Sequence, residues 1–410
     1  MWIALAAAMV MSSSTDLNDA MAREGSGTSW LPDATPMHAW MWMPEDAMLM
    51  VHGQIMPRFT RVGGDRDVSA AGRGGRARFD APSMFMAMYA HALGDADQLG
   101  LRAMASLDPL IEGSYGYPLL YQTGETYHGT PLHDRQHPHD LIDELSATWS
   151  HRFTATQSAY VYVGYPGEPA LGPPMFWHRP SGADIPDAPI GHHWQDATHI
   201  AFGVGTLGYS LGDVELEASV FTGREPDQTR YNFDPPKLDS YSGRISWNPA
   251  RELALQISHG YLKGPESLEP DVAVHRTTAS LIWVKPLASG AWSTSVVWGR
   301  NHTVDEDSDS WLVESDWHQR RHTVFGRVER VEKSAHELAL APDEGPLPVS
   351  EGTIGYLFDL FQDAAGTDVG LGAAVTLGSN DSALDAVYGD GIHTGFQVFV
   401  RIRPSALQPM

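Results

Sequence analysis

The stretch T-D-V-G-L-G-A-A-V-T-L at residues 367–377 switches between two kinds of side chain at every step. From Val369 to Leu377 every second residue is aliphatic, whereas the residues between them are Gly, Gly, Ala and Thr. Successive side chains of a β-strand point to opposite faces of the sheet. A residue period of two therefore predicts a strand with one apolar face and one face of small or polar side chains.

The same alternation returns at 214–220, 241–247 and 396–403. One face of these segments carries mainly aliphatic and aromatic side chains. The other face is mostly polar and includes charges of both signs, such as Glu215, Arg244 and Arg401. A soluble β-sandwich would show a similar alternation, with its polar residues outward. The length and spacing of the strands must therefore separate a sandwich from a membrane barrel.

Strand length and connection length favour the barrel. Most candidate strands run about nine to twelve residues, which is enough to cross a bilayer at a tilt. They are expected at 46–56, 83–92, 97–107, 143–153, 157–164, 198–210, 212–222, 240–248, 251–261, 273–284, 290–301, 309–317, 322–331, 352–361, 367–377 and 393–403. Short connections alternate with long ones, the pattern of an outer-membrane barrel with short periplasmic turns and long outer loops. We predict an all-β, transmembrane antiparallel β-barrel of about 16 strands (14–18), with both termini on the periplasmic side.

Aromatic residues agree with this prediction. Trp247, Trp283, Trp292 and Trp298 lie on or near the apolar faces, as an interfacial girdle requires. The alternative is that they form the core of an ordinary sandwich.

Composition excludes some classes of function. The 27 Lys and Arg residues face 51 Asp and Glu residues, which gives a net charge of −24. A nucleic-acid partner is not expected, because phosphate binding needs basic surface. Without Cys, the chain forms neither disulfides nor thiolate metal sites. The mean hydropathy of −0.26 says little about a barrel, since alternating apolar and polar residues cancel.

The N-terminal region differs from the rest of the chain. Residues 2–11 form an apolar run of about signal-peptide length, although no basic residues precede it. The run is too short to span a bilayer as a helix. Residues 12–36 are rich in Ser, Gly and Asp. We interpret residues 1–36 as a signal-like, mobile leader and residues 37–410 as a single β-barrel domain.

The segment from Tyr127 to His151 concentrates histidine: Y-H-G-T-P-L-H-D-R-Q-H-P-H-D-L-I-D-E-L-S-A-T-W-S-H. Its two prolines rule out one continuous helix. Imidazole is a common metal ligand and a proton carrier. The candidate metal ligands here are His128, His133, His137, His139 and Asp140. One interpretation is a metal or proton site on a loop folded into the barrel; the other is a polar loop whose histidines bond to neighbours and plug the structure.

A second long loop, at 165–197, supplies His178, His192 and His193 as further candidate ligands. In an extended strand the adjacent His192 and His193 cannot both face one ion. On the predicted topology the two histidine-rich loops leave neighbouring hairpins and can meet in the mouth of the barrel. The alternative is a proline-rich surface loop with scattered histidines.

Methionine is frequent near the start of the predicted barrel. Met48, Met50 and His52 alternate with aliphatic residues, so this stripe is expected to line the lumen if the other face meets lipid. Thioether and imidazole ligands together favour copper, especially Cu(I). Methionine also simply fills apolar surface, because its side chain adapts its shape.

Catalytic motifs are weak. No phosphate-binding loop occurs. The pairs His133–Asp134 and His139–Asp140 offer a base for a serine such as Ser146 or Ser150, but no spacing fixes their geometry. An outer-membrane, histidine-dependent hydrolase is therefore kept as an alternative to a protein without enzymatic activity.

Three segments carry a resemblance to a known family. G-T-P-L-H-D-R-Q-H-P-H-D at 129–140, M-H-A-W-M-W-M-P at 37–44, and F-W-H-R-P-S at 176–181 with G-H-H-W at 191–194 resemble an uncharacterised set of bacterial proteins of similar length. The resemblance spans most of the chain and implies an outer-membrane β-barrel. The Met and His content is also similar to that of outer-membrane copper-resistance proteins, although the long Met-rich N-terminal repeats of those proteins are missing here.

These observations predict a porin-like barrel in the bacterial outer membrane that passes or binds a small solute or a metal ion. Lipid is the expected partner of its outer face, and a homo-oligomer is compatible with it. Arg135, Arg244 and Arg401 are expected to line the lumen opposite Asp and Glu and to set up a transverse field. The alternative is a metal-resistance protein that holds copper or zinc on its histidines.

Overall fold

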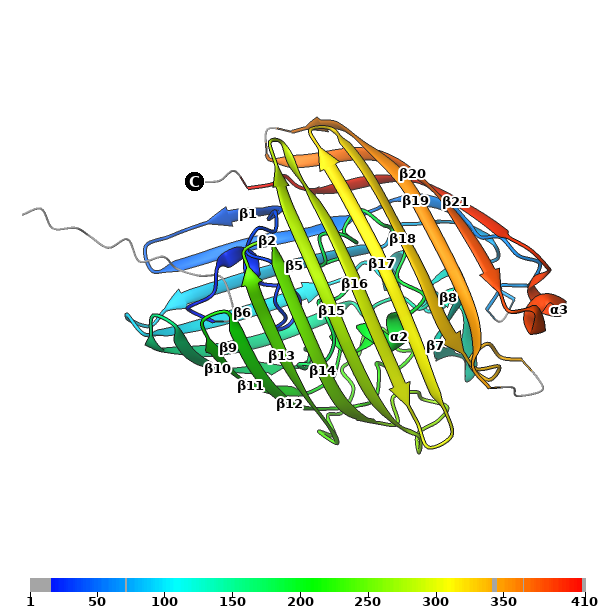
Figure 1. The fold of residues 1–410 in the computed structure, drawn as a ribbon, viewed down its shortest axis with the longest axis horizontal. Coiled ribbons are helices and arrows are strands. Elements are labelled where there is room, and N and C mark those ends of the chain that lie inside the picture. Colours follow the sequence, from blue (N-terminus) through cyan, green and yellow to red (C-terminus); the bar gives the residue numbers. More distant parts are fainter. Residues whose placement is uncertain (1–15, 71, 341–344, 364, 408–410) are drawn as a thin grey trace, which may run out of the picture.

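The computed structural model describes residues 16–70, 72–340, 345–363 and 365–407. The signal-like run at 2–11 lies outside the described residues. A single antiparallel sheet of 19 strands curls into a closed barrel, and a separate two-stranded hairpin lies inside it (Figure 1). Among the described residues, no helix is both long enough and apolar enough to cross a bilayer.

Two positions in the barrel wall are each built from two short strands. β2 (Ala47–Ile55) continues into β3 (Arg58–Arg61), and β4 (Ala77–Asp80) continues into β5 (Ser83–Ala92). The pairings Ile55 with Ser83 and Arg58 with Asp80 belong to one uninterrupted register. A proline lies in each break, Pro57 and Pro82, where the missing N–H interrupts the ladder.

The remaining wall strands pair with their neighbours in chain order. They are β6 (Asp97–Ala105), β9 (Ile142–Thr154), β10 (Gln157–Gly164), β11 (Val204–Leu211), β12 (Val214–Phe221), β13 (Ser240–Ala250), β14 (Leu253–Lys263), β15 (Ala273–Leu287), β16 (Gly290–His302), β17 (Asp307–Gln319), β18 (His322–Lys333), β19 (Leu347–Gln362), β20 (Thr367–Asn380) and β21 (His393–Pro404).

The two ends of the chain close the barrel together. β21 pairs with β3 and reaches β2 through Ile402 and Ile55. β1 (Ala39–Trp42) then takes over along β2, with Ala39 opposite His52. The N–H of Leu407 donates to the carbonyl of Met37 at 2.8 Å, so β1 and β21 share one position in the wall. Three positions are thus filled by two strands each, which leaves a closed barrel of 16.

Polarity across the wall is reversed relative to a soluble protein. In β12, Glu215 is 1% exposed and Glu217 is 6% exposed, whereas Leu216 is 51% exposed and Val220 is 52% exposed. A soluble sandwich would bury the aliphatic side chains and expose the carboxylates. Trp247 and Trp292 also face outward. The apolar outer face therefore meets lipid, which excludes the sandwich alternative.

All 16 predicted strands correspond to positions in the wall, with some different boundaries. The strand expected at 198–210 begins only at Val204, because Ala197–His199 forms a short 3-10 helix, η2. The predicted loop 108–142 contains a hairpin that the sequence analysis did not anticipate, β7 (Tyr117–Tyr127) and β8 (Thr130–Gln136). This hairpin pairs with no wall strand in the described part of the chain.

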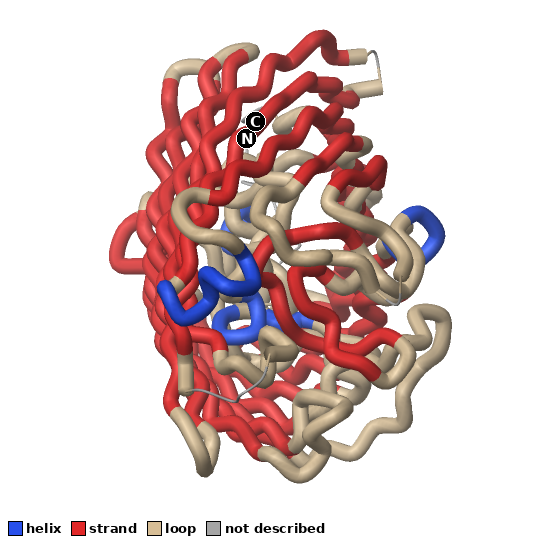
Figure 2. Tube along the Cα trace, turned by 90° about the vertical axis from the view of Figure 1, so that its right-hand side faces the viewer, coloured by secondary structure: helices blue, strands red, loops and turns tan. Residues whose placement is uncertain are grey.

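Three segments of the chain fill the interior. They are residues 16–36, residues 106–141 with the β7–β8 hairpin, and residues 165–203, which we call the inner loop (Figure 2). Short helices accompany them: η1 (Met21–Arg23), α1 (Asp108–Ile111) and α2 (His192–Gln195). Two further short helices, η3 (Ser382–Leu384) and α3 (Asp385–Tyr388), precede β21.

Residues 16–36 do not behave as the mobile leader that their composition suggested. Arg102 of the wall binds Glu24 and the carbonyl of Gly27. Arg244 donates to the hydroxyl of Thr28 at 2.9 Å. Polar wall side chains thus supply partners for a segment too polar to form a core by itself, and they hold it against the inner wall.

Candidate functional site: a histidine cluster in the lumen

Five histidines from the two predicted histidine-rich loops meet inside the barrel. They form the histidine cluster: His137, His139, His192, His193 and His199. The ring centroids of His192 and His199 are 5.2 Å apart, and those of His139 and His199 are 5.3 Å apart. His193 lies 5.3 Å from His192 and 5.5 Å from His137. The β8–β9 connection and the inner loop are therefore in contact inside the barrel, and metal binding by their histidines stays a prediction.

Local structure explains how both members of the G-H-H-W pair join the cluster. His192 and His193 lie on α2, where successive side chains are turned by about 100° rather than 180°. Both rings can therefore lie beside the same residue, and both approach His137. His199 lies one turn further along, at the end of η2.

Each ring of the cluster uses Nδ1 to bind an oxygen. Nδ1 of His192 donates to Asp196 at 2.6 Å, and Nδ1 of His139 donates to Asp108 at 2.9 Å. The same nitrogen lies 3.2 Å from Glu225 in His193, 3.1 Å from Glu125 in His137 and 2.9 Å from the carbonyl of Asp196 in His199. Because these oxygens accept, Nδ1 carries the proton and Nε2 of the neutral ring keeps its lone pair.

None of the five Nε2 atoms has a hydrogen-bond partner, although all five are buried. A buried polar atom without a partner costs stability, so such atoms usually have a ligand or a functional reason. An imidazole held at Nδ1 by a carboxylate and free at Nε2 is the usual arrangement of a metal-binding histidine. The unpartnered Nε2 atoms are therefore candidate donors to a transition-metal cation, but in the described part of the chain no three of them lie within 4.8 Å of one another.

Burial and neighbouring charges control the protonation of the cluster. Burial lowers the pKa of His137, and Arg230 and the other imidazoles add to this effect. Burial likewise lowers the pKa of His192 and of His199. Burial opposes the charged form of His139 as well, but the hydrogen bond and charge of Asp108 outweigh it and raise the pKa to about 9. At neutral pH the cluster thus offers His137, His192 and His199 as neutral rings.

Other predicted ligands lie outside the cluster. His128 is exposed on the β7–β8 hairpin, and Nδ1 of His133 pairs with Asp134 at 2.9 Å. His178 packs edge-on against His52, with ring centroids 5.5 Å apart. Asp140 approaches no imidazole: it accepts from Arg230 at 3.3 Å.

The residues predicted to line the lumen make different kinds of contact. Met48 and Met50 are buried on the inner face, and Met50 belongs to an apolar cluster with Met175, Phe176 and Trp177 of the inner loop. The methionine stripe therefore supplies a contact surface for the inner loop.

The three arginines all take part in buried polar contacts. Arg244 pairs with Glu217 at 2.7 Å, and Arg401 pairs with Asp184 of the inner loop. Arg135 lies on the hairpin instead of the wall and donates to the carbonyls of Tyr115 and Val68 at 2.7 and 3.0 Å.

Sequence reasoning missed the carboxylates that orient the cluster. Asp108, Glu125, Asp196 and Glu225 come from different parts of the chain, between 17 and 117 residues away from one another by sequence number. Asp196 lies four residues after His192. No local motif joins the other three to the histidines, and only the packing of the inner loop against the hairpin and wall brings them there.

The two serines considered for hydrolysis have no histidine partner. Ser146 donates to Glu144 at 2.6 Å, and the hydroxyl of Ser150 is buried without a hydrogen bond. Neither hydroxyl is therefore hydrogen-bonded to an imidazole.

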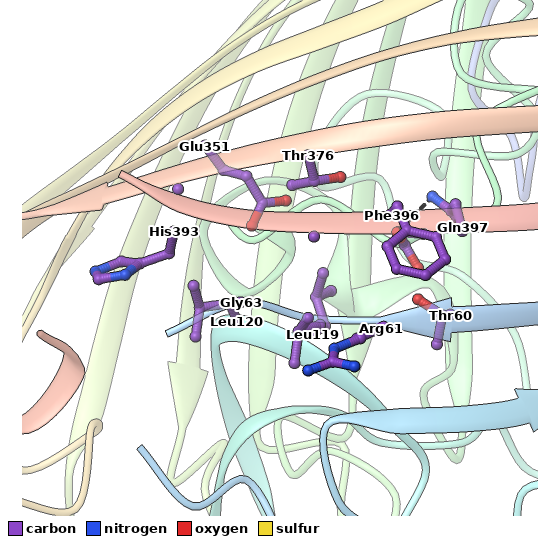
Figure 3. A pocket seen from close by; sticks show the side chains of 14 residues that line it. Thr60, Arg61, Gly63, Leu119, Leu120, Glu351, Thr376, His393, Phe396 and Gln397 are labelled. Carbon is purple, nitrogen blue, oxygen red and sulfur yellow. Dashed lines mark hydrogen bonds between the residues drawn. The ribbon is translucent and has the colours of Figure 1, made fainter. Parts of the chain in front are cut away.

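Besides a space of about 10 Å³ bordered by His137, His139 and His199, two cavities adjoin the interior segments. One, of about 20 Å³, lies where Leu119 and Leu120 of β7 meet the wall near Glu351 and Phe396 (Figure 3). It holds about one water molecule and is too small for a solute. The other, of about 280 Å³, lies among the long loops and is bordered by His193 of the cluster.

Neither a protein-family model nor a curated protein matches the sequence. Solved structures do match in fold. OmpF of Salmonella typhi, in complex with daunomycin, has a TM-score of 0.52 at 8% identity over 89% of this chain and 100% of that one. The anion-selective porin from Comamonas acidovorans has a TM-score of 0.50 at 11% identity over 87% and 99%. A loop L8 deletion mutant of OmpT, an outer-membrane protein of Vibrio cholerae, has a TM-score of 0.50 at 9% identity over 88% and 100%.

These likenesses concern the fold alone. Together with the closed strand order and the apolar outer face, they show a porin-like, channel-type β-barrel of 16 strands in the bacterial outer membrane.

Proposed function

We propose that this barrel binds a transition-metal cation, zinc or copper, in its lumen and serves the passage or retention of that ion at the outer membrane. The observation that carries the proposal is the set of five buried Nε2 atoms without partners. Their rings are already oriented from the opposite nitrogen, mostly by carboxylates.

The ligand chemistry selects the class of ion. Imidazole nitrogen suits zinc, copper and nickel, whereas calcium and magnesium prefer oxygen. The methionines are occupied in apolar packing, so the donor set does not specifically require Cu(I). Zinc and Cu(II) are therefore the ions to test first.

The segments that fill the lumen limit how an ion could pass through the barrel. Residues 16–36, the hairpin and the inner loop occupy the interior, so passage of an ion requires hand-over between side chains or movement of the inner loop. Retention requires neither. Passage of a small solute is the second candidate function, supported by the fold that the chain shares with porins.

The test is zinc and Cu(II) binding to detergent-purified protein, followed by equilibrium dialysis and elemental analysis. The double variant His137→Gln with His192→Gln removes two neutral imidazoles of the cluster, and we expect at least a tenfold loss of affinity at the inner site. The double variant His259→Gln with His322→Gln serves as the control, because both rings are exposed on the outside of the wall.

Heat-modifiable gel mobility verifies that each variant still forms the barrel. Unchanged metal affinity in the folded His137→Gln, His192→Gln protein would contradict the proposal. Conductance across planar bilayers then separates the two functions, since solute passage predicts currents in the absence of metal. Assembly into a homo-oligomer stays a prediction.

A further inference from the structure

The 280 Å³ cavity among the long loops is strongly acidic, and we call it the vestibule. The loops that follow β14, β16 and β18 border it, together with the β7–β8 hairpin. Its acidic lining residues are Glu125, Glu266, Glu269, Asp305, Glu306 and Glu337. Arg276, His193 and His336 are the basic or imidazole side chains in the lining. Because the six carboxylates outnumber the single arginine, the vestibule attracts cations.

Acidic lining alone does not make a binding site, but the inner end of the vestibule has a defined set of ligands. One ligand atom each from His193, Glu225 and Glu266 lies within 4.8 Å of the other two. His193 and Glu225 are buried, Nδ1 of His193 lies 3.2 Å from Glu225 and 4.0 Å from Glu266, and Oε2 of Glu225 has no hydrogen-bond partner. In the described part of the chain, no other three His or acidic residues meet in this way.

Gly124 fixes the position of this histidine. It lies on the vestibule wall with a positive φ of +105°, and a Cβ built on it would overlap Nε2 of His193. The glycine backbone therefore packs directly against Nε2, and Nδ1 is the nitrogen that faces Glu225 and Glu266. Any other residue would both strain the backbone and displace the ring.

We propose that His193, Glu225 and Glu266 form a capture site for a divalent first-row transition-metal ion that enters through the vestibule. One nitrogen and two carboxylates fit zinc, cobalt or manganese. The site deepens the proposed function, on which it rests, because His193 also contacts His137 and His192 and so joins the vestibule to the rest of the histidine cluster.

Nearby cations set the charge balance of the capture site. Arg276 faces the vestibule, and its Nε donates to Asn301 at 3.0 Å while its Nη1 is buried without a partner. Two other buried cations are engaged elsewhere: Arg230 binds Glu125, and Lys333 donates to Thr123 at 2.9 Å. Arg276 is thus the cation that competes most directly with a bound metal ion.

The experiment titrates detergent-purified, full-length protein with Co²⁺, whose visible spectrum reports coordination, and with Zn²⁺ by calorimetry. Glu266→Gln should weaken the capture site at least tenfold and leave the inner site intact. Glu269→Gln is the matched control. It removes the same charge from the same loop and cavity, but Glu269 pairs with His336 at 3.0 Å and is not one of the three ligands. It should change the affinity less than threefold.

The double variant His137→Gln with His192→Gln separates this inference from the proposed function. It leaves all three capture ligands in place, so Co²⁺ should still bind there with a spectrum that Glu266→Gln abolishes. Equal effects of Glu266→Gln and Glu269→Gln would overturn the capture site, since the vestibule would then act only as a diffuse negative charge. Loss of the inner site alone, with Glu266→Gln without effect, would also overturn it while leaving the proposed function standing.

Discussion

The barrel wall and the chain packed inside it are held in place by different interactions. Wall strands satisfy their backbone groups through a regular ladder, and their side chains alternate between lipid and lumen. The interior segments have little regular pairing and are held by side chains, as where Arg244 joins Glu217, Thr28 and the carbonyl of Gly172. The wall is therefore stabilised by a repeating pattern, whereas the interior depends on individual ionic contacts.

The largest effect is expected from breaking one of those contacts. Arg244→Met leaves Glu217 buried without its partner, which costs about 3–5 kcal/mol when a buried ion pair loses one member. Urea unfolding in lipid vesicles measures the change. The double variant Arg244→Met with Glu217→Gln removes the orphaned charge as well and should recover most of the loss. A single variant as stable as the parent would mean that the interior does not depend on this pair.

A charge on the lipid side of the wall should have the next largest effect. Leu216→Arg places a guanidinium at an outward position that is 51% exposed, and Arg near the bilayer midplane costs about 2–4 kcal/mol. The same unfolding experiment applies. Ser242→Ala on the inner face of the neighbouring β13 is the control and should cost less than about 1 kcal/mol, because its hydroxyl is buried without a hydrogen bond. If Leu216→Arg were equally mild, the assignment of this face to lipid would be wrong.

Orientation of the histidine cluster should matter for metal binding more than for stability. Asp108→Asn weakens the hold on Nδ1 of His139, and loss of such an outer partner lowers metal affinity about 10- to 100-fold. Asp97→Asn is matched to it, because Asp97 binds Nδ1 of His151 at the same 2.9 Å but outside the cluster. Calorimetry with Zn²⁺ should therefore separate the two variants, and identical affinities would argue against a metal on His139.

Acidification should produce the smallest change, confined to the inner loop. Burial opposes the charge of Asp184, but Arg401 and Arg403 lower its pKa well below the ordinary value of 3.8. A carboxyl group with a lowered folded-state pKa stabilises the fold above its unfolded value, and this contribution is lost as the pH falls further. Proteolysis of the inner loop should therefore increase below about pH 4.

Asp184→Asn provides the control for that experiment. It removes the titrating group, so its inner loop should be cleaved faster at neutral pH and show little further increase on acidification. A parent protein whose cleavage does not change between pH 7 and pH 3 would contradict this role of Asp184.

Most wall strands could be predicted because the alternation of apolar and polar side chains is visible within each short segment of sequence. The strand at 157–164 was predicted with the boundaries of β10, and the gap between β2 and β3 contains Pro57. The prediction was wrong for residues 198–203, where the histidine-rich segment bends inward in place of starting β11. It also assigned no structure to β7 and β8, because their side chains are buried on both sides and do not alternate.

Some residues of the candidate site could likewise be selected from the sequence, and others could not. His137, His139, His192 and His193 were singled out as candidate ligands from their density along the chain, and their role as ligands stays a prediction. Glu225 and Glu266 were not recognised, since a single carboxylate in a loop carries no distinctive pattern. Arg135 was assigned to the lumen lining from composition, yet it fastens the hairpin through backbone carbonyls.

The sequence alone was enough to predict a membrane barrel of about 16 strands. The two-residue period and the alternation of short and long connections can both be read from residues that are close together in the sequence. Which histidines share a site, and which carboxylates orient them, was decided only when the inner loop and the hairpin folded back into the lumen. Burial there leaves each polar atom dependent on partners that lie far away along the chain.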